Sequence, residues 1–292
     1  MVPRELFKTI RQIEIRTRGL VHDIFGGEYH SAFKGQGIEF SEVRPYQIGD
    51  DIRTIDWNVS ARTGETYVKI FEEEREQTLM LVVDISGSED FGSAGRFKRE
   101  LAAEICAVAA FSAIQNNDKV GLLLFTEQVE RFVPPKKGRR HVLRLIRDLF
   151  AHAPKARGTH LAGALHHVLH VLRRRSIVLI LSDFMDEGYE PVLRALARRH
   201  DVVAIHLIDP REEELPPVGL VELTDAETGE TVLVDTQSPR VRRAFAERSY
   251  ARQQQVAALM KRLRVDRVPV RTDEGFIEPL IRFFRQRNRK GR

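Results

Sequence analysis

Short, uninterrupted apolar runs separated by helical segments are the feature that most constrains the fold of this chain. A strand buried on both faces of a parallel sheet has a continuous apolar sequence, whereas a strand with one solvated face alternates. The segments between the runs repeat apolar residues at helical spacing, as in 97–116. Strands that alternate with helices in this way predict an α/β fold with a doubly wound, mostly parallel sheet. The clearest runs are 79–83, 120–125, 177–181 and 202–207.

The remaining segments are expected to add an appendage, a hairpin and a tail to this sheet. Residues 1–75 are predicted to form an N-terminal helix and an irregular, β-containing segment packed on the main domain. The main domain is assigned to residues 76–285 and includes a hairpin at about 218–236. Residues 286–292 form a basic tail that we expect to be disordered.

The composition limits where the protein works and what it binds. Its one cysteine, Cys106, lies in an apolar helical stretch, so no internal disulfide can form and a reducing compartment is favoured. The N-terminus shows no signal-peptide core, and no run approaches the roughly 20 apolar residues that span a bilayer. The net charge of +5 is modest, and no nucleic-acid-binding motif accompanies it. We therefore expect a cytoplasmic protein with no transmembrane segment and no nucleic-acid partner.

Polar residues follow two of the apolar runs at the point where each predicted strand ends. Asp84, Ser86 and Ser88 alternate after the first run, and Asp183 follows the third. Thr159 lies in a loop before a helix, within reach of the same edge. In an open α/β sheet, ligands gather at the carboxyl ends of the strands, near the switch in strand order. Hydroxyl and carboxylate oxygens suit a hard divalent cation, so these five side chains predict a Mg²⁺ or Mn²⁺ site.

Helix capping is the alternative explanation of the same residues. Asp84 and Ser86 could cap the helix that follows them, and Asp183 could cap the next one. Thr159 could be an N-cap by itself. Each motif alone is compatible with capping, whereas the three together favour a shared ion.

The order of the three motifs carries a resemblance to a known family. Asp-x-Ser-x-Ser follows a buried strand, Gly-Thr-x-Leu-x-x-Ala-Leu opens a helix, and an aspartate follows a later buried strand. This arrangement resembles the metal-ion-dependent adhesion site of von Willebrand factor A domains. The resemblance implies that Ser86 and Ser88 ligate the ion directly and that Thr159 does so directly or through water. Asp84 and Asp183 would then act mainly through water or hydrogen bonds.

One departure from that family stands beside the site. Von Willebrand factor A domains usually have glycine after the last aspartate, where this chain has Phe184. We expect this residue to reshape the rim of the site and to alter the choice of partner.

Residues 35–76 hold a second, charge-rich pattern. It comprises Gly35-x-Gly37-x-Glu39-Phe40, Val43-Arg44-x-Tyr46, Gly49-Asp50-Asp51-x-Arg53-x-Ile55-Asp56-Trp57-Asn58, Ser60-Ala61-Arg62 and Val68-Lys69-x-Phe71-Glu72-Glu73-Glu74-Arg75. With the metal motifs, it resembles a bacterial family of unknown function, DUF58, whose members carry a von Willebrand factor A-like fold; the resemblance covers most of the chain. Members often occur beside MoxR-type AAA+ ATPases, which implies an ATPase partner. From the residues themselves, we expect Arg–carboxylate pairs to fix this segment against the sheet and Trp57 to lie in the core.

These features favour a binding module over an enzyme, and we assign no catalytic residue. The first hypothesis is a divalent-metal-dependent module, an adaptor or partner of a MoxR-type ATPase, that binds an acidic residue of its partner. With few carboxylates around it, the ion would keep much of its charge and attract a carboxylate. The alternative is a metal-dependent hydrolase at the same site, with Asp183 as the only candidate general base. A weaker alternative is association with lipid or nucleic acid through the basic tail.

Overall fold

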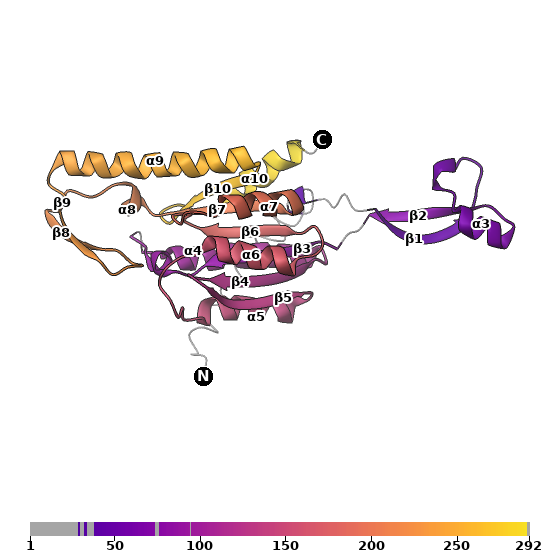
Figure 1. Ribbon diagram of the computed structural model, residues 1–292, viewed down its shortest axis with the longest axis horizontal. Helices are drawn as coiled ribbons and strands as arrows, with labels where there is room; N and C mark the ends of the chain where they lie inside the picture. Colours follow the sequence, from indigo (N-terminus) through magenta and orange to yellow (C-terminus); the bar gives the residue numbers. More distant parts are fainter. Residues whose placement is uncertain (1–28, 30–31, 34–37, 74–75, 94, 291–292) are drawn as a thin grey trace.

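A six-stranded sheet lies at the centre of the computed structural model (Figure 1). β5 pairs antiparallel with β4, and every other pairing in this sheet is parallel. The prediction of an α/β fold with a doubly wound, mostly parallel sheet was therefore confirmed. The structure describes residues 29, 32–33, 38–73, 76–93 and 95–290. In spatial order the strands are β10 (Asp266–Arg271), β7 (Asp201–Ile208), β6 (Ile177–Ser182), β3 (Thr78–Asp84), β4 (Lys119–Phe125) and β5 (Val129–Lys136).

The central strand β3 shows why its sequence is apolar throughout. Leu79, Leu81 and Val83 pack into the core on one face of the sheet, while Met80 and Val82 pack into the core on the other. Because successive side chains of a strand point to opposite faces, burial on both faces leaves no position for a polar residue. After Thr78 at the start of the strand, the next polar side chain is Asp84 at its carboxyl end.

Helices cover both faces of the sheet. α4, α5 and α10 pack on one face, and α6, α7 and α9 pack on the other (Figure 1). The chain runs from β3 to β4 on one side and later returns to β6 on the other side of β3, so the strand order switches beside β3. The helices are α4 (Lys98–Gln115), α5 (Arg139–Ala151), α6 (Leu161–Val171), α7 (Glu190–Arg199), α8 (Pro210–Glu213), α9 (Pro239–Leu263) and α10 (Ile277–Lys290), with a 3₁₀ helix η3 (Gly87–Asp90) after β3.

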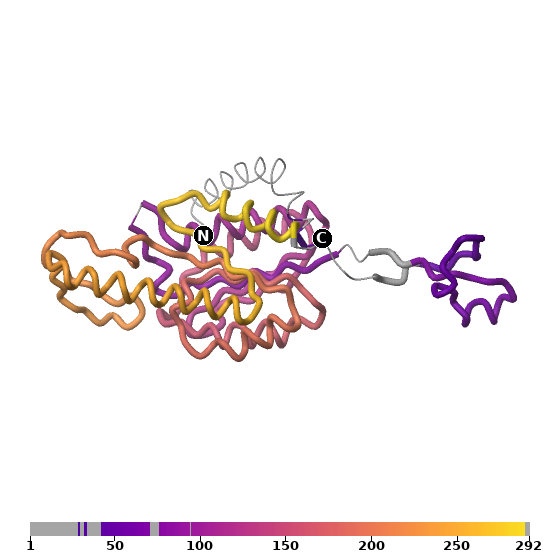
Figure 2. The backbone as a smooth tube through the Cα atoms, turned by 90° about the horizontal axis from the view of Figure 1, so that it is seen from above, coloured from indigo at the N-terminus to yellow at the C-terminus, as the bar shows by residue number. Residues whose placement is uncertain are grey.

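Residues 38–73, which we call the arm, extend away from the sheet (Figures 1 and 2). The arm pairs β1 (Ile38–Pro45) with β2 (Tyr67–Glu73) and includes η2 (Ile52–Thr54) and α3 (Trp57–Thr63). Two expectations about it were wrong. Arg44 makes two 2.7 Å hydrogen bonds to Asp50 inside the arm, not to the sheet. Trp57 is 69% exposed, because no layer of the domain covers α3.

The C-terminal region is more ordered than its basic composition suggests. α10 continues to Lys290, so the expectation of a disordered tail was wrong for residues 286–290. Arg287 forms an ion pair with Asp201 and stacks 4.6 Å from the ring centroid of Phe33. These contacts explain why a basic segment stays helical. The predicted N-terminal helix and residues 291–292 lie outside the described residues.

A second hairpin stands at the opposite end of the domain from the arm. β8 (Leu220–Thr224) pairs antiparallel with β9 (Thr231–Asp235), which confirms the hairpin predicted at about 218–236. Figures 1 and 2 both place this hairpin beside the start of α9, on the side toward which β3 and β6 run. It therefore lies near the carboxyl edge of the sheet.

Buried His206 on β7 makes the fold sensitive to acid. Its Nδ1 accepts hydrogen bonds from Arg267, and burial together with the Arg267 charge lowers the pKa of His206 from 6.5 to about 3. The unfolded chain therefore binds more protons as the pH falls below about 6.5, and stability decreases in that window. Between pH 7.5 and 5.0 we expect the wild type to lose about 2 kcal/mol more than His206→Gln. Urea unfolding at both pH values measures this, and equal losses would show that His206 is free to charge in the fold.

Candidate metal centre

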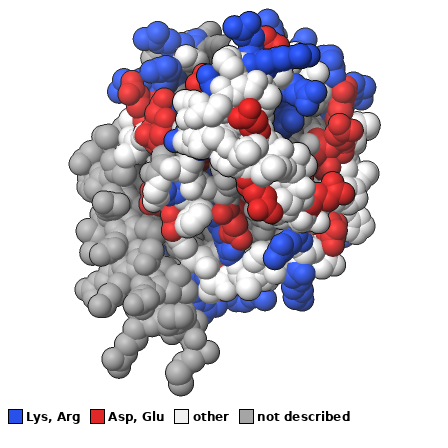
Figure 3. All heavy atoms as spheres, turned by 90° about the vertical axis from the view of Figure 1, so that its left-hand side faces the viewer, with Lys and Arg blue, Asp and Glu red and all other residues white. Residues whose placement is uncertain are grey.

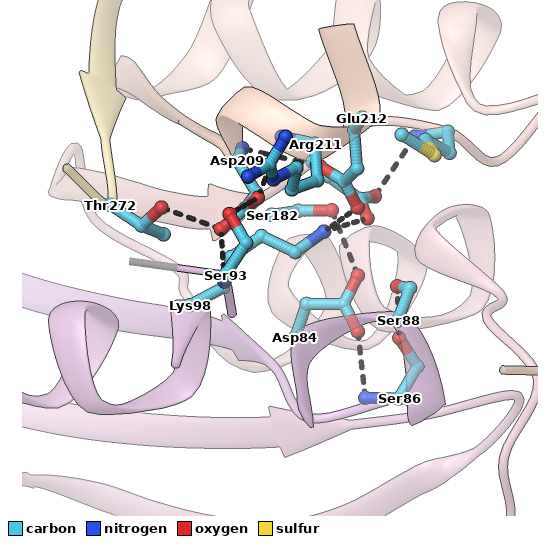
Figure 4. A network of polar contacts seen from close by, with 12 residues as sticks. Asp84, Ser86, Ser88, Ser93, Lys98, Ser182, Asp209, Arg211, Glu212 and Thr272 are labelled. Atoms are coloured by element: carbon cyan, nitrogen blue, oxygen red, sulfur yellow. Dashed lines mark hydrogen bonds and ion pairs between the residues drawn. The ribbon is translucent and has the colours of Figure 1, made fainter. Parts of the chain in front are cut away.

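The loop after β3 brings three of the predicted residues together (Figure 4). Asp84 is fully buried; one carboxylate oxygen accepts a 3.0 Å hydrogen bond from the Ser86 amide and the other a 2.8 Å bond from the Ser182 hydroxyl. The hydroxyl oxygens of Ser86 and Ser88 lie 3.1 Å apart. Asp84, Ser86 and Ser88 thus form one oxygen-rich loop at the carboxyl edge, where the switch in strand order leaves room for a ligand.

Asp183 joins this loop from β6, the parallel neighbour of β3. It is buried, and one of its oxygens accepts a 3.1 Å hydrogen bond from the Met185 amide. A hydrogen bond from the Ser88 side chain also acts on Asp183 and lowers its pKa. Four of the five predicted residues therefore belong to one cluster.

Thr159 makes a different contact from the one expected. Its hydroxyl donates a 2.6 Å hydrogen bond to a carboxylate oxygen of Glu227, in the turn between β8 and β9. Its loop nevertheless reaches the cluster, because the Gly87 amide donates a 2.8 Å bond to the Arg157 carbonyl. Capping does not explain Thr159, since the N-cap of α6 is His160.

Glu89 is a site residue that the sequence analysis missed. It is fully buried in η3, and one oxygen from each of Asp84, Glu89 and Asp183 lies within 4.8 Å of the others. Neither carboxylate oxygen of Glu89 has a hydrogen-bond partner. An acidic residue directly after the second serine of the motif was the available signal, but only the 3₁₀ turn directs it inward.

Lys98, also missed, is the cation of the cluster. It lies in the first turn of α4, is fully buried, and donates hydrogen bonds of 2.9 Å to Asp183 and 2.7 Å to Glu212 (Figure 4). Burial lowers its pKa, but the carboxylates of Asp183, Glu89 and Glu212 outweigh burial and raise it. Lys98 therefore stays charged and balances part of the acidic cluster.

The protonation of the cluster shows how much acidic charge is left over. Burial would raise the pKa of Asp183, but Lys98 holds it below its usual range. Burial and Asp183 raise the pKa of Asp84 to about 7, although Ser86 and Ser182 oppose this. Burial raises the pKa of Glu89 well above its ordinary value. Such shifts mark carboxylates that lack a cation.

These residues fit a hard divalent cation. Apart from the Lys98 ammonium, which pairs with Asp183, the side chains named above offer oxygen, the donor that Mg²⁺ and Mn²⁺ prefer. The unpartnered carboxylate of Glu89 is a buried polar group whose cost is removed only by a proton or by a cation. Asp84, Glu89 and Asp183 would hold the ion, with the hydroxyls of Ser86 and Ser88 beside them.

A neighbouring network fixes the loops around the centre. Asp209 follows β7 and accepts hydrogen bonds from the Ser93 hydroxyl at 2.5 Å and the Thr272 hydroxyl at 2.6 Å (Figure 4). It also caps α8, which carries Glu212. Because these contacts all lie within the protein, Asp209 holds α8 and its Glu212 in place beside Lys98. Its carboxylate is not available as a metal ligand.

Phe184 is buried instead of lining the rim. Its ring packs edge-on to His206 at 5.7 Å, and the side chain is 2% exposed. Its backbone has φ of +55°, a left-handed conformation that favours glycine. The expectation that Phe184 reshapes the rim was therefore wrong for its side chain, because that side chain is buried. Packing of the ring offsets the strain of the left-handed backbone.

The geometry and the comparisons together identify the family. A mostly parallel sheet with helices on both faces and an Asp-x-Ser-x-Ser loop at its carboxyl edge define a von Willebrand factor A-like domain. The chain belongs to the family described as protein of unknown function DUF58, whose model matches residues 42–256. An uncharacterized protein of Mycobacterium tuberculosis is 34% identical over 288 residues, which cover 98% of this chain and 90% of that one.

Solved structures similar to this chain include the following two. BatB from Bacteroides thetaiotaomicron has a TM-score of 0.49 and 15% identity, with 73% of this chain and 99% of that chain covered. A von Willebrand factor type A protein from Catenulispora acidiphila has a TM-score of 0.39 and 10% identity, with 76% of this chain and 43% of that chain covered. Within the described ranges, no helix is both long enough and apolar enough to cross a bilayer. The cytoplasmic location stays a prediction.

Removing Lys98 tests whether it balances the cluster. Lys98→Met leaves Asp183 and Glu212 without their buried partner, and we expect a loss of about 3–5 kcal/mol in unfolding free energy at pH 7.5. The exposed pair of Lys119 with Glu76 is the matched control, because Lys119→Met should cost less than about 1 kcal/mol. Equal losses in urea unfolding would mean that the pairs of Lys98 are solvated.

Replacing Glu89 tests the ion. Glu89→Gln keeps the shape of the side chain and removes its buried charge, so with EDTA we expect unchanged or higher thermal stability. At Mg²⁺ about 100-fold above its Kd, the wild type should gain about 2.7 kcal/mol and the variant should gain far less. Asp90→Asn, an exposed neighbour in η3, is the control. A variant that keeps the full Mg²⁺ gain would remove Glu89 from the site.

Proposed function

We propose that this protein is a divalent-metal-dependent protein-binding module that recognises an acidic residue of its partner. The observation that carries the proposal is the buried trio Asp84, Glu89 and Asp183, in which Glu89 has no partner for either oxygen. The trio lies at the carboxyl edge of a parallel sheet, beside the switch in strand order, where such folds bind ligands. An ion held there would supply a coordination site for an oxygen from another protein.

The number of carboxylates around the proposed ion affects how that ion would attract a partner. The sequence motifs predict few carboxylates around the ion, but three converge here. Lys98 pairs with both Asp183 and Glu212, so a divalent ion beside these two carboxylates, Asp84 and Glu89 would leave the ionised unit with a net charge of only about −1. Recognition would therefore depend on a direct bond between the ion and a partner oxygen more than on long-range attraction.

The surface around the centre also suits a protein partner. Figure 3 looks onto the carboxyl edge: acidic side chains are scattered over a mostly uncharged centre, and Lys and Arg gather along the upper rim, over α9. Exposed apolar side chains belong to the hairpin, and exposed arginines belong to the start of α9. Protein interfaces commonly combine an apolar centre with a charged rim. The exposed residues are Val218, Leu220, Val232 and Leu233, with Arg240 and Arg243.

The hydrolase alternative has less support. It needs a general base beside the ion, and Asp183 was the only candidate. Its hydrogen bonds from Lys98 and the Met185 amide lower its pKa, which weakens it as a base. We therefore retain the proposal that the protein is not an enzyme.

A MoxR-type AAA+ ATPase is the partner that the family resemblance implies. We expect the immobilised chain to retain a purified MoxR-type ATPase with Mg²⁺, to release it with EDTA, and to bind it again when Mg²⁺ is restored. Glu89→Gln should abolish retention, and Asp90→Asn should preserve it. Retention that is indifferent to both EDTA and Glu89→Gln would refute metal-dependent binding, whereas absent retention with intact Mg²⁺ binding would refute only the choice of ATPase.

A further inference from the structure

α9 carries far more positive than negative charge. Seven of its residues are basic and one is acidic. Its only buried side chains are those of Val256 and Met260, in its second half. Figures 1 and 2 place its first half beyond the carboxyl ends of the strands, beside the β8–β9 hairpin. The start of α9 is therefore a basic, largely exposed helix at the edge of the sheet that holds the candidate metal centre.

Three exposed arginines of this helix, which we call the arginine row, lie along one side of it. Arg240, Arg248 and Arg252 are spaced by multiples of four residues, so they follow one another on the helix surface. At a rise of about 1.5 Å per residue, the arginine row is about 18 Å long. Figure 3 shows Lys and Arg gathered along the rim over α9. The row is thus long enough to contact several residues of another chain.

The arginine row has no acidic partner within the part of the chain that the structure describes. Arg240 and Arg248 make no hydrogen bond or ion pair with any described residue. Arg252 makes one hydrogen bond there, to the sulfur of Met185 at 3.4 Å. Like charges four residues apart, as at Arg248 and Arg252, destabilise a helix. The row therefore presents positive charge that an acidic group of another molecule can neutralise.

The arginine row ends at a pocket that it shares with the candidate metal centre. α9 contributes Ser249, Arg252 and Gln253 to the lining of this pocket. The carboxyl side of the sheet contributes Asp183 and Glu212. Asp183 is also one of the three carboxylates that could hold an ion. A segment bound along the row therefore reaches the metal centre at the Arg252 end.

The two ends of the arginine row favour a protein segment over a nucleic acid. At the hairpin end, Leu220 and Leu233 are each 68% exposed. At the pocket end, the carboxylates of Asp183 and Glu212 face one ammonium, that of Lys98, and would repel a chain of phosphates. An acidic protein segment can place carboxylates on the arginines and apolar side chains on the leucines, whereas every unit of a nucleic acid is charged.

We propose that the arginine row binds an acidic, partly apolar segment of a protein partner, which lies extended from the β8–β9 hairpin to the pocket at Asp183. This docking surface deepens the proposed function and rests on it for the choice of a protein ligand. An extended chain rises about 3.3 Å per residue, so the row accommodates about five or six residues. Arginine forms bidentate pairs with carboxylates, and such pairs would fix the register of the segment.

The experiment measures the binding of a fluorescein-labelled peptide to the full chain by fluorescence polarisation, with Mg²⁺ present. The peptide has about eight residues that alternate glutamate with leucine, which spans the row when extended. A second peptide has glutamine in place of every glutamate. We expect the acidic peptide to bind at least about tenfold more tightly at low salt, and about 0.5 M NaCl to remove most of this preference.

Removal of two arginines tests the arginine row itself. The double variant Arg248→Gln with Arg252→Gln should bind the acidic peptide about tenfold more weakly, the loss expected for two partly exposed ion pairs. The matched control is Arg173→Gln with Arg198→Gln, which removes the same charge from exposed arginines that precede β6 and β7 at the amino edge of the sheet. It should match the wild type. Thermal melts of both variants, expected within a few degrees of the wild type, show that weaker binding does not come from unfolding.

The outcomes distinguish the docking surface from the proposed function. The docking surface is overturned if the wild type shows no preference for the acidic peptide, if the arginine double variant binds that peptide as tightly as the wild type, or if single-stranded DNA binds more tightly than the peptide. None of these results affects the metal-dependent module. If the arginine double variant binds the peptide more weakly while EDTA and Glu89→Gln change nothing, the docking surface stands and metal-dependent recognition is refuted.

Discussion

The arrangement of this domain depends on the balance between buried carboxylates and one buried ammonium at the carboxyl edge of the sheet. Parallel pairing of β3 with β6 brings Asp84 and Asp183 together, so the topology that buries the core also concentrates acidic charge. An uncompensated buried charge costs several kcal/mol, which is why the first turn of α4 must hold Lys98 there. The Lys98 ammonium forms ion pairs with Asp183 and Glu212 but makes no hydrogen bond to Glu89. A divalent ion at the proposed site would complete this balance.

Lys98 also connects the metal centre to α8 and to the loops that hold α8 in place. If an ion approaches Asp183, it repels the ammonium, but Lys98 keeps Glu212 as a second partner 2.7 Å away. Glu212 lies on α8, which begins at the Asp209 cap, and Asp209 in turn bonds to the hydroxyls of Ser93 and Thr272. Loops from three parts of the chain therefore meet around one lysine.

The sequence predicted the strands, the helices and the local motif well. It predicted poorly which residues from distant parts of the chain contact the site. Continuous apolar runs predicted the strands, and alternation after β3 predicted the Asp84 loop, because both follow from the geometry of a single strand. Glu89 was missed because only a 3₁₀ turn points it inward, and Lys98 because a lysine normally lies on the surface. Trp57 was assigned to the core by residue type, yet the arm that carries it has no layer to pack against. Glu227 lies 68 residues from Thr159, a separation that no local pattern reveals.

The two hairpins lie at opposite ends of the parallel strands, and this separates two kinds of recognition. The arm joins the amino end of β3 and exposes Trp57, Ile48 and Ile52, far from the carboxylates (Figures 1 and 2). The β8–β9 hairpin touches the metal centre at Gly87. The central sheet therefore lies between the arm and the carboxylates. Binding through the arm would be independent of metal, so the part of any binding that a chelator removes belongs to the carboxyl edge.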